Sequence, residues 1–132
     1  MSSQTMMRRD RASAGLGIEV ITDEPGRAVV RMPVRDDMLN GFDIIHGGLV
    51  FALADTAFAI ACNEDENVTV AAGADITFLK STTAGAVLTA TATRRALSGR
   101  TGLYDVTVVD DAGEAVAEFR GRSFTTRRQA PA

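Results

Sequence analysis

The segment HGGLVFALADTAFAIAC, residues 46–62, decides the fold of this chain. From Leu49 onward it is almost unbroken Leu, Val, Phe, Ala and Ile, so a helix formed by it is apolar on every side. Such a helix has to be wrapped by other structure. One carboxylate, Asp55, interrupts the segment, and burial of an acid is costly unless it is hydrogen-bonded, paired or functional. The segment therefore predicts a core helix with an acid that needs an explanation.

The rest of the folded chain predicts strands. Residues 17–34 predict two strands around a turn at residues 23–26, where Pro-Gly is strong turn chemistry. Residues 35–48 predict a loop, and the strand predicted after the helix, at residues 68–80, bends or bulges near Gly73. Residues 86–95, 101–110 and 114–126 predict further strands, with Thr89, Thr91 and Thr93 facing away from Leu88, Ala90 and Ala92. The order predicts an α+β fold, one long buried helix against a curved antiparallel sheet of about five to six strands.

The two ends of the chain carry no such pattern. Residues 1–14 are polar, Arg-rich and without periodicity, which predicts a flexible arm, and residues 127–132 predict a loose tail. The folded domain is expected at residues 15–126. The N-terminal residues lack the apolar core of a secretory signal, and residues 49–62 are too short for the roughly 20 residues that span a bilayer. These features predict a cytoplasmic protein without a membrane segment.

The amino-acid composition excludes several classes of partner and site. The 132 residues fit one domain, and the net charge of −3 predicts no general attraction to nucleic acid or to an anionic membrane. A single Cys and a single His exclude a disulfide framework and make a structural zinc site implausible. We expect no metal and no redox cofactor.

The start of the helix is a second feature that indicates chemistry. Gly47 and Gly48 follow His46, and two glycines leave bare N–H groups at the positive helix end, where an anion or oxyanion is stabilised. A tight turn would also use these glycines. Gly47 and Asp55 are eight residues apart, roughly 12 Å along one helix, so both cannot reach one carbonyl carbon. If they cooperate, Asp55 comes from another subunit, which predicts an obligate dimer with two equivalent interface sites.

Several motifs resemble the hotdog-fold acyl-CoA thioesterases, and within them the phenylacetic-acid-degradation (PaaI-type) branch. The most specific are Asn40-Gly41, His46-Gly47-Gly48 and the run LADTAFA at residues 53–59. The resemblance continues more weakly through TFLKSTTAG at residues 77–85, TGLYDVTVVD and FRGRS, and covers about residues 15–125. It implies a central helix wrapped by a curved sheet, edge-to-edge dimers and often tetramers.

The resemblance also implies residue roles. Asp55 would be the general base or the nucleophile of thioester hydrolysis, and the Gly47 amide of the facing subunit would polarise the thioester carbonyl. Asn40 would orient the water or the carbonyl, and His46 would support the loop and face the sulfur. The acyl group would be phenylacetyl or hydroxyphenylacetyl. Coenzyme A enters as part of the substrate and product, so no separate cofactor is implied.

A further set of residues would line the coenzyme A channel, namely Gly48, Phe78, Lys80, Ser81, Arg95, Arg100 and Thr101. Lys80 and the arginines are predicted to cluster near the turn at residues 98–99, either as an ordinary solvated hairpin tip or as phosphate ligands. One position departs from some relatives, where a Ser or Thr on the strand after the helix helps to hold the water. Here that position falls within residues 70–72, Val-Ala-Ala, so this hydrogen bond is expected to be missing.

Other candidates are weaker. Cys62 is interpreted as core, and His46 as a hydrogen-bonded strut rather than a stand-alone base. Phe42, Phe51 and Phe58 could line an aryl pocket, although such residues are mostly core. Two alternative functions stay open: a hotdog enoyl-CoA hydratase or dehydratase that uses His46, and a dimeric acyl-CoA binder without catalysis.

Overall fold

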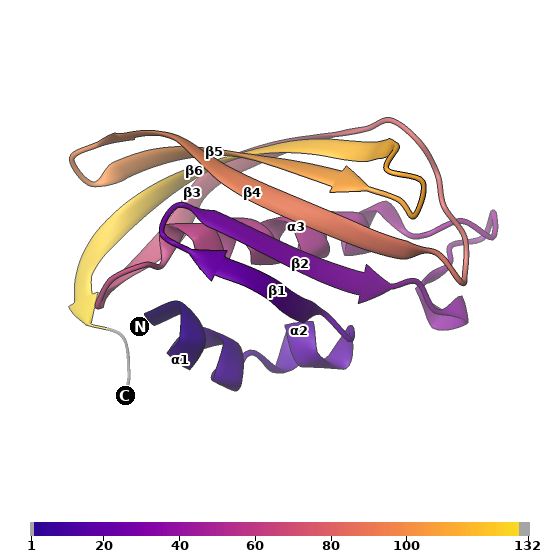
Figure 1. Cartoon of the computed structure of the whole chain (residues 1–132), viewed down its shortest axis with the longest axis horizontal. Helices are drawn as coiled ribbons and strands as arrows, with labels where there is room; N and C mark the ends of the chain where they lie inside the picture. Colours follow the sequence, from indigo (N-terminus) through magenta and orange to yellow (C-terminus); the bar gives the residue numbers. More distant parts are fainter. Residues whose placement is uncertain (1, 130–132) are drawn as a thin grey trace.

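One long helix, α3, lies in the hollow of a curved antiparallel sheet in the computed structural model, which describes residues 2–129 (Figure 1). In chain order the elements are α1 Ser2–Arg9, α2 Arg11–Gly15, β1 Glu19–Glu24, β2 Arg27–Pro33, the 3₁₀ turn η1 Asp36–Met38, α3 Gly47–Cys62, β3 Asn67–Phe78, β4 Val87–Ser98, β5 Thr101–Val109 and β6 Ala115–Gln129. No helix within the described residues is both long and apolar enough to cross a membrane.

The sheet has six strands in the order β1-β2-β4-β5-β6-β3, and every neighbouring pair is antiparallel. This confirms the predicted α+β fold with a central helix. The strand that follows the helix in sequence, β3, crosses to the far edge and pairs only with β6 on its inner side. The outer edge of β3 is therefore left without a partner strand within residues 2–129.

The core lies between the sheet and α3. Alternation along β4 places Leu88, Ala90 and Ala92 against the helix, while Thr89 and Thr91 point outward, as predicted. Phe58 of α3 is buried and packs against the rings of Tyr104 and Phe119, with centroids 5.5 and 5.8 Å away. A helix that is apolar on nearly every side is stable here because strands cover most of its circumference.

The predicted turns and the bulge are confirmed. Gly26 and Gly99 both have positive φ in the two hairpin turns, a conformation that favours glycine. The pairing of β3 with β6 slips between Ala71 and Gly73, where the sequence predicts a bulge. The helix begins at Gly47, two residues before the start of the apolar run.

The N-terminal residues differ from the flexible arm that the sequence predicts, because they form helices α1 and α2. Ser3 is fully buried and donates a hydrogen bond to Asp23 of β1 at 2.8 Å. Met6 and Met7 pack against the core. Asp10 caps α2 by accepting from the Ser13 amide at 2.9 Å. Capping and tertiary packing stabilise helices too short to persist alone, and a search for periodicity misses both effects.

The tail also differs in part. Strand β6 continues to Gln129, whose side chain donates to Asn67 of β3 at 3.2 Å, so residues 127–129 are strand rather than loose. Residues 130–132 of the predicted tail lie outside the described residues.

The packing of Gly121 against Phe58 gives a stability test. A Cβ at Gly121 would lie 2.8 to 2.9 Å from three ring atoms of Phe58, which is buried and cannot move aside. We expect Gly121→Ala to lower the free energy of unfolding by about 1–3 kcal/mol, measured by urea denaturation. The control is Gly15→Ala, where an added Cβ meets nothing within 4 Å. Equal stability of the two variants would contradict this packing.

Candidate active site

The candidate site is built around the first turn of α3. His46 is the N-cap residue, and its Nδ1 accepts a hydrogen bond from the Gly48 amide at 3.2 Å. Its own amide donates to the Met38 carbonyl at 2.9 Å, which ties the cap to the preceding loop. This bears out the interpretation of His46 as a hydrogen-bonded strut, with one ring nitrogen committed to holding the helix start.

The Gly47 amide is different from that of Gly48. Among the described residues, no acceptor lies within hydrogen-bond reach of the Gly47 N–H. Unpaired amides at a helix start are the donors that bind anions or carbonyl oxygens. The ring of Phe78 packs on this glycine, since a Cβ here would lie 3.1 Å from the ring Cζ. The position therefore offers a free donor under a close aromatic cover.

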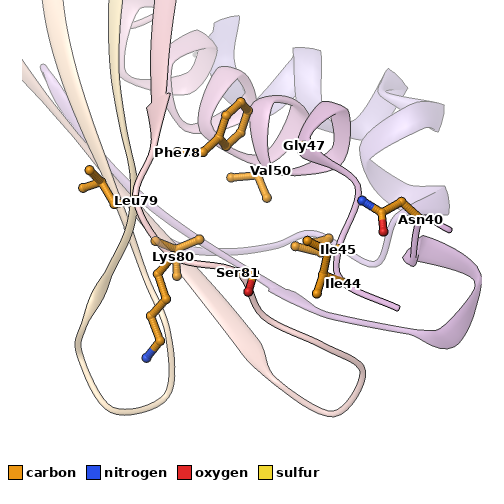
Figure 2. A pocket seen from close by; sticks show the side chains of 10 residues that line it. Asn40, Ile44, Ile45, Gly47, Val50, Phe78, Leu79, Lys80 and Ser81 are labelled. Atoms are coloured by element: carbon orange, nitrogen blue, oxygen red, sulfur yellow. The ribbon is translucent and has the colours of Figure 1, made fainter. Parts of the chain in front are cut away.

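A cavity of about 360 Å³ opens beside this glycine (Figure 2). Its wall combines the loop before α3, the first turn of α3 and the segment that follows β3. The lining residues are Asn40, Ile44, Ile45, Gly47, Val50, Phe78, Leu79, Lys80, Ser81 and Val116. Five residues that the sequence predicts for the site thus line one cavity, whereas the apolar residues Ile44, Ile45, Val50 and Val116 of its wall are not predicted.

The orientation of Asn40 follows from its neighbour. Its Oδ1 accepts a hydrogen bond from the Phe42 amide at 2.8 Å, so the side-chain oxygen is already engaged. An amide whose oxygen is held by an N–H presents its NH₂ group elsewhere. Figure 2 shows the nitrogen of Asn40 on the side of the Gly47 ribbon. Asn40 is therefore set up to donate into the cavity.

Lys80 lines the cavity but its ammonium group is engaged. It lies 2.5 Å from Asp110 Oδ2 and 2.8 Å from Glu114 Oε1. Hydrogen bonds to these two carboxylates raise the pKa of Lys80, and the hydrogen bond from Lys80 lowers the pKa of Asp110. A phosphate that binds Lys80 would have to compete with Asp110 and Glu114. These two acids are not among the residues that the sequence predicts for the site.

Asp55 lies two turns farther along α3 and does not line this cavity. Its side chain is half-buried, and among the described residues it makes no hydrogen bond and no ion pair. The structure thus removes the ordinary explanation, in which the acid bonds an amide across the core. An acid that is partly desolvated and unpaired within its own chain is a candidate for chemistry.

The pKa of Asp55 is raised from its ordinary value. Desolvation by burial is the larger cause, and the negative charge of Asp10, the N-cap residue of α2, is the second. A carboxylate with a raised pKa is a stronger base than an exposed one. The site therefore supplies a free donor at Gly47 and a strengthened base at Asp55, both on one helix.

Three predicted coenzyme A contacts lie away from the cavity. Arg100 and Thr101 stand at the start of β5, whereas the carboxylates that hold Lys80 follow its end, about 30 Å away for a nine-residue strand. Arg95 pairs with Asp105 on the outer face of the sheet at 3.4 Å. The predicted cluster of Lys80 with the arginines is therefore wrong within one chain, because consecutive antiparallel strands carry these residues to opposite ends of the sheet.

The remaining candidates are also placed. Cys62 is buried, and desolvation raises its thiol pKa to about 12, so it is core rather than a nucleophile. Phe58 is core, and Phe51 is half-buried against Phe119. Phe42 is 85% exposed and does not line the cavity beside Gly47. Residues 70–72 are exposed on β3 and carry no hydroxyl group, which leaves the missing water contact as a prediction.

Comparison with known proteins identifies the family. The model of the thioesterase superfamily matches residues 42–117. The acyl-coenzyme A thioesterase PaaI of Escherichia coli (strain K12) is 44% identical over 122 residues, which are 92% of this chain and 87% of that protein. The structure of E. coli PaaI, from the phenylacetic acid degradation operon, matches with a TM-score of 0.94 and 42% identity, covering 97% of this chain and 93% of the other.

Two other solved structures extend the comparison. The TT0310 protein of Thermus thermophilus matches with a TM-score of 0.84 and 40% identity, over 89% of this chain and 99% of the other. The smu.793 protein of Streptococcus mutans UA159, solved with acetyl CoA bound, matches with a TM-score of 0.79 and 27% identity, over 83% and 88%. With a helix wrapped by a six-stranded antiparallel sheet, this chain belongs to the thioesterase superfamily, with the hotdog fold and a PaaI-type sequence.

Proposed function

We propose that this protein hydrolyses acyl-CoA thioesters, with phenylacetyl-CoA or hydroxyphenylacetyl-CoA as substrates, to the free acid and coenzyme A. One observation carries the proposal: α3 holds an amide donor at Gly47 and an acid with a raised pKa at Asp55, and neither has a partner among the residues that the structure describes. Thioester hydrolysis requires an oxyanion donor and a base. The named activity of E. coli PaaI and its operon support this substrate class.

The active unit in this proposal is a dimer. Edge strand β3 is twelve residues long, and no other strand of the described residues pairs with its outer edge, a surface that pairs readily with another strand. Phe78 and Leu79, at and just after its end, are 53% and 57% exposed. Pairing of β3 with the same strand of a second copy would cover this edge and place the two α3 helices side by side.

The spacing on α3 fits such a dimer. Gly48, Ala52, Asp55 and Ala59 follow one another at intervals of four, three and four residues, so they share one face of the helix. Each is at least partly exposed, and apart from Asp55 they are small. In two antiparallel helices related by a two-fold axis near residue 51, the midpoint between residues 47 and 55, Gly47 of one copy faces Asp55 of the other.

The chemistry then follows from the placement of the two groups. The Gly47 N–H binds the thioester carbonyl oxygen, and Asn40 donates alongside it. Asp55 of the second copy takes a proton from water as the water oxygen attacks the carbonyl carbon. The C–S bond then breaks, and the departing thiolate of coenzyme A receives that proton. The apolar side chains of Ile44, Val50 and neighbouring residues line the same cavity beside these donors.

Removal of the carboxylate tests the base. Asp55→Asn keeps the size of the side chain and removes its basicity, so we expect thiol release from phenylacetyl-CoA to fall by about 10²- to 10⁴-fold. Circular dichroism should show an intact fold. The control is Glu66→Gln, an exposed acid after α3, which should keep the wild-type rate. Near wild-type thiol release by Asp55→Asn would refute the mechanism. If the wild-type protein, supplied with an enoyl-CoA, removes the enoyl absorbance without releasing thiol, the activity is that of a hydratase.

Removal of one amide tests the oxyanion donor. Gly47 is the first residue of α3, a position that tolerates proline, and His46 has the extended backbone that precedes a proline well, with φ −64° and ψ 129°. We expect Gly47→Pro, which lacks the N–H, to lower kcat by about 10²- to 10³-fold. Gly47→Ala adds the same Cβ against Phe78 but keeps the N–H, and should retain most activity. Equal loss in both variants would show that the space at residue 47 matters rather than its donor.

A further inference from the structure

The N-terminal helix α2 is attached to α3 at the residue next to Asp55. The Ser13 hydroxyl donates to Asp10 Oδ2 at 2.6 Å, and it also forms a hydrogen bond with the Thr56 hydroxyl of α3 at 3.2 Å. Ser13 and Thr56 are both buried. The Thr56 oxygen also lies 2.8 Å from the carbonyl oxygen of Ala52, one helical turn earlier, so its single proton is shared between that carbonyl and the oxygen of Ser13, whose own proton goes to Asp10. These bonds fix the carboxylate of Asp10 relative to the segment of α3 that carries Asp55.

We propose that α2 belongs to the active site, and that Asp10, held against α3 through Ser13 and Thr56, is a positioning residue that acts through Asp55. This inference rests on the proposed function, because it gives Asp55 the role of the base. It adds a residue that touches no substrate and acts through another acid. It also gives a role to part of the N-terminal segment, residues 1–14, for which the sequence pattern predicts only a flexible arm.

Capping of α2 does not by itself require a charged residue at position 10. Asparagine and serine cap helices about as well as aspartate, so capping does not select a charged residue. A negative charge near a partly desolvated carboxyl group disfavours the charged form of that group. The negative charge of Asp10 raises the pKa of Asp55, next to the larger effect of burial. Capping by Asp10 therefore brings an electrostatic effect that a neutral cap would not have.

The other charged groups around α3 do not reproduce this effect. Within α3 the second titratable group is Cys62, whose raised thiol pKa keeps it neutral. Arg8 and Arg9 on α1 and Arg11 on α2 are exposed. Glu64 is paired with Arg94 after the end of α3. The buried strand residues that face α3 are uncharged, including Val30, Leu88, Val106 and Phe119.

The direct test is a carbon NMR titration of the Asp55 carboxyl group, assigned with Asp55→Asn. Asp10→Asn keeps a cap and removes the charge, so Asp55 should keep its own charge to lower pH and its titration midpoint should fall. Asp10→Ser, another good cap, should lower it in the same direction. The matched control is Asp23→Asn, which makes the same change at the acid that holds Ser3 of α1. It should leave the midpoint unmoved.

A second measurement follows the acid limb of kcat/KM, which reports the base of the free enzyme. This limb should move to lower pH in Asp10→Asn and Asp10→Ser, and stay in place in Asp23→Asn. An Asp55 midpoint that is unchanged or higher in both Asp10 variants would overturn the inference, even if Asp55→Asn is inactive and the proposed function stands. Conversely, an active Asp55→Asn with a lowered midpoint in the Asp10 variants would refute the proposed function and leave the coupling between the two acids intact.

Discussion

The fixed rise of an α-helix is the constraint on which the account of this protein depends. Gly47 and Asp55 lie on one straight helix of sixteen residues, and eight residues of helix separate them by roughly 12 Å. Neither group has a partner within the described chain. No side-chain rotation closes this distance, so a reaction that needs both groups needs two helices. The unpaired edge of β3 supplies the means of bringing a second helix alongside.

The same helix explains why an acid persists in an apolar segment. Most of α3 is covered by strands, and residues such as Leu53, Ala54 and Ala57 are fully buried. Asp55 lies instead on the side that the sheet does not enclose, where α2 brings Asp10 to the neighbourhood. Partial burial and a neighbouring carboxylate destabilise the ionised form of Asp55 and so raise its pKa. A carboxylate with a raised pKa accepts a proton more readily and is a better base.

The sequence predicts the architecture well, because an all-apolar helix and alternating strands each have one stable way to bury their apolar faces. It also identifies Asn40, Gly47, Phe78 and Ser81, which converge on one cavity. It fails where tertiary contacts override local pattern: Ser3 and Ser13 are buried by helices that no periodicity predicts, and the ammonium of Lys80 is held by acids 30 and 34 residues away. Spacing along the chain cannot reveal such pairings.

The most direct measurement uses mixed dimers of Asp55→Asn and Gly47→Pro, purified with two different affinity tags. In such a dimer one site combines the normal residue 47 of the first variant with the normal residue 55 of the second. If two chains share each reaction centre, the mixed dimer should recover about half of the wild-type rate of thiol release, although both parent dimers are inactive. A mixed dimer as inactive as its parents would show that each chain carries a complete site, and would contradict the account.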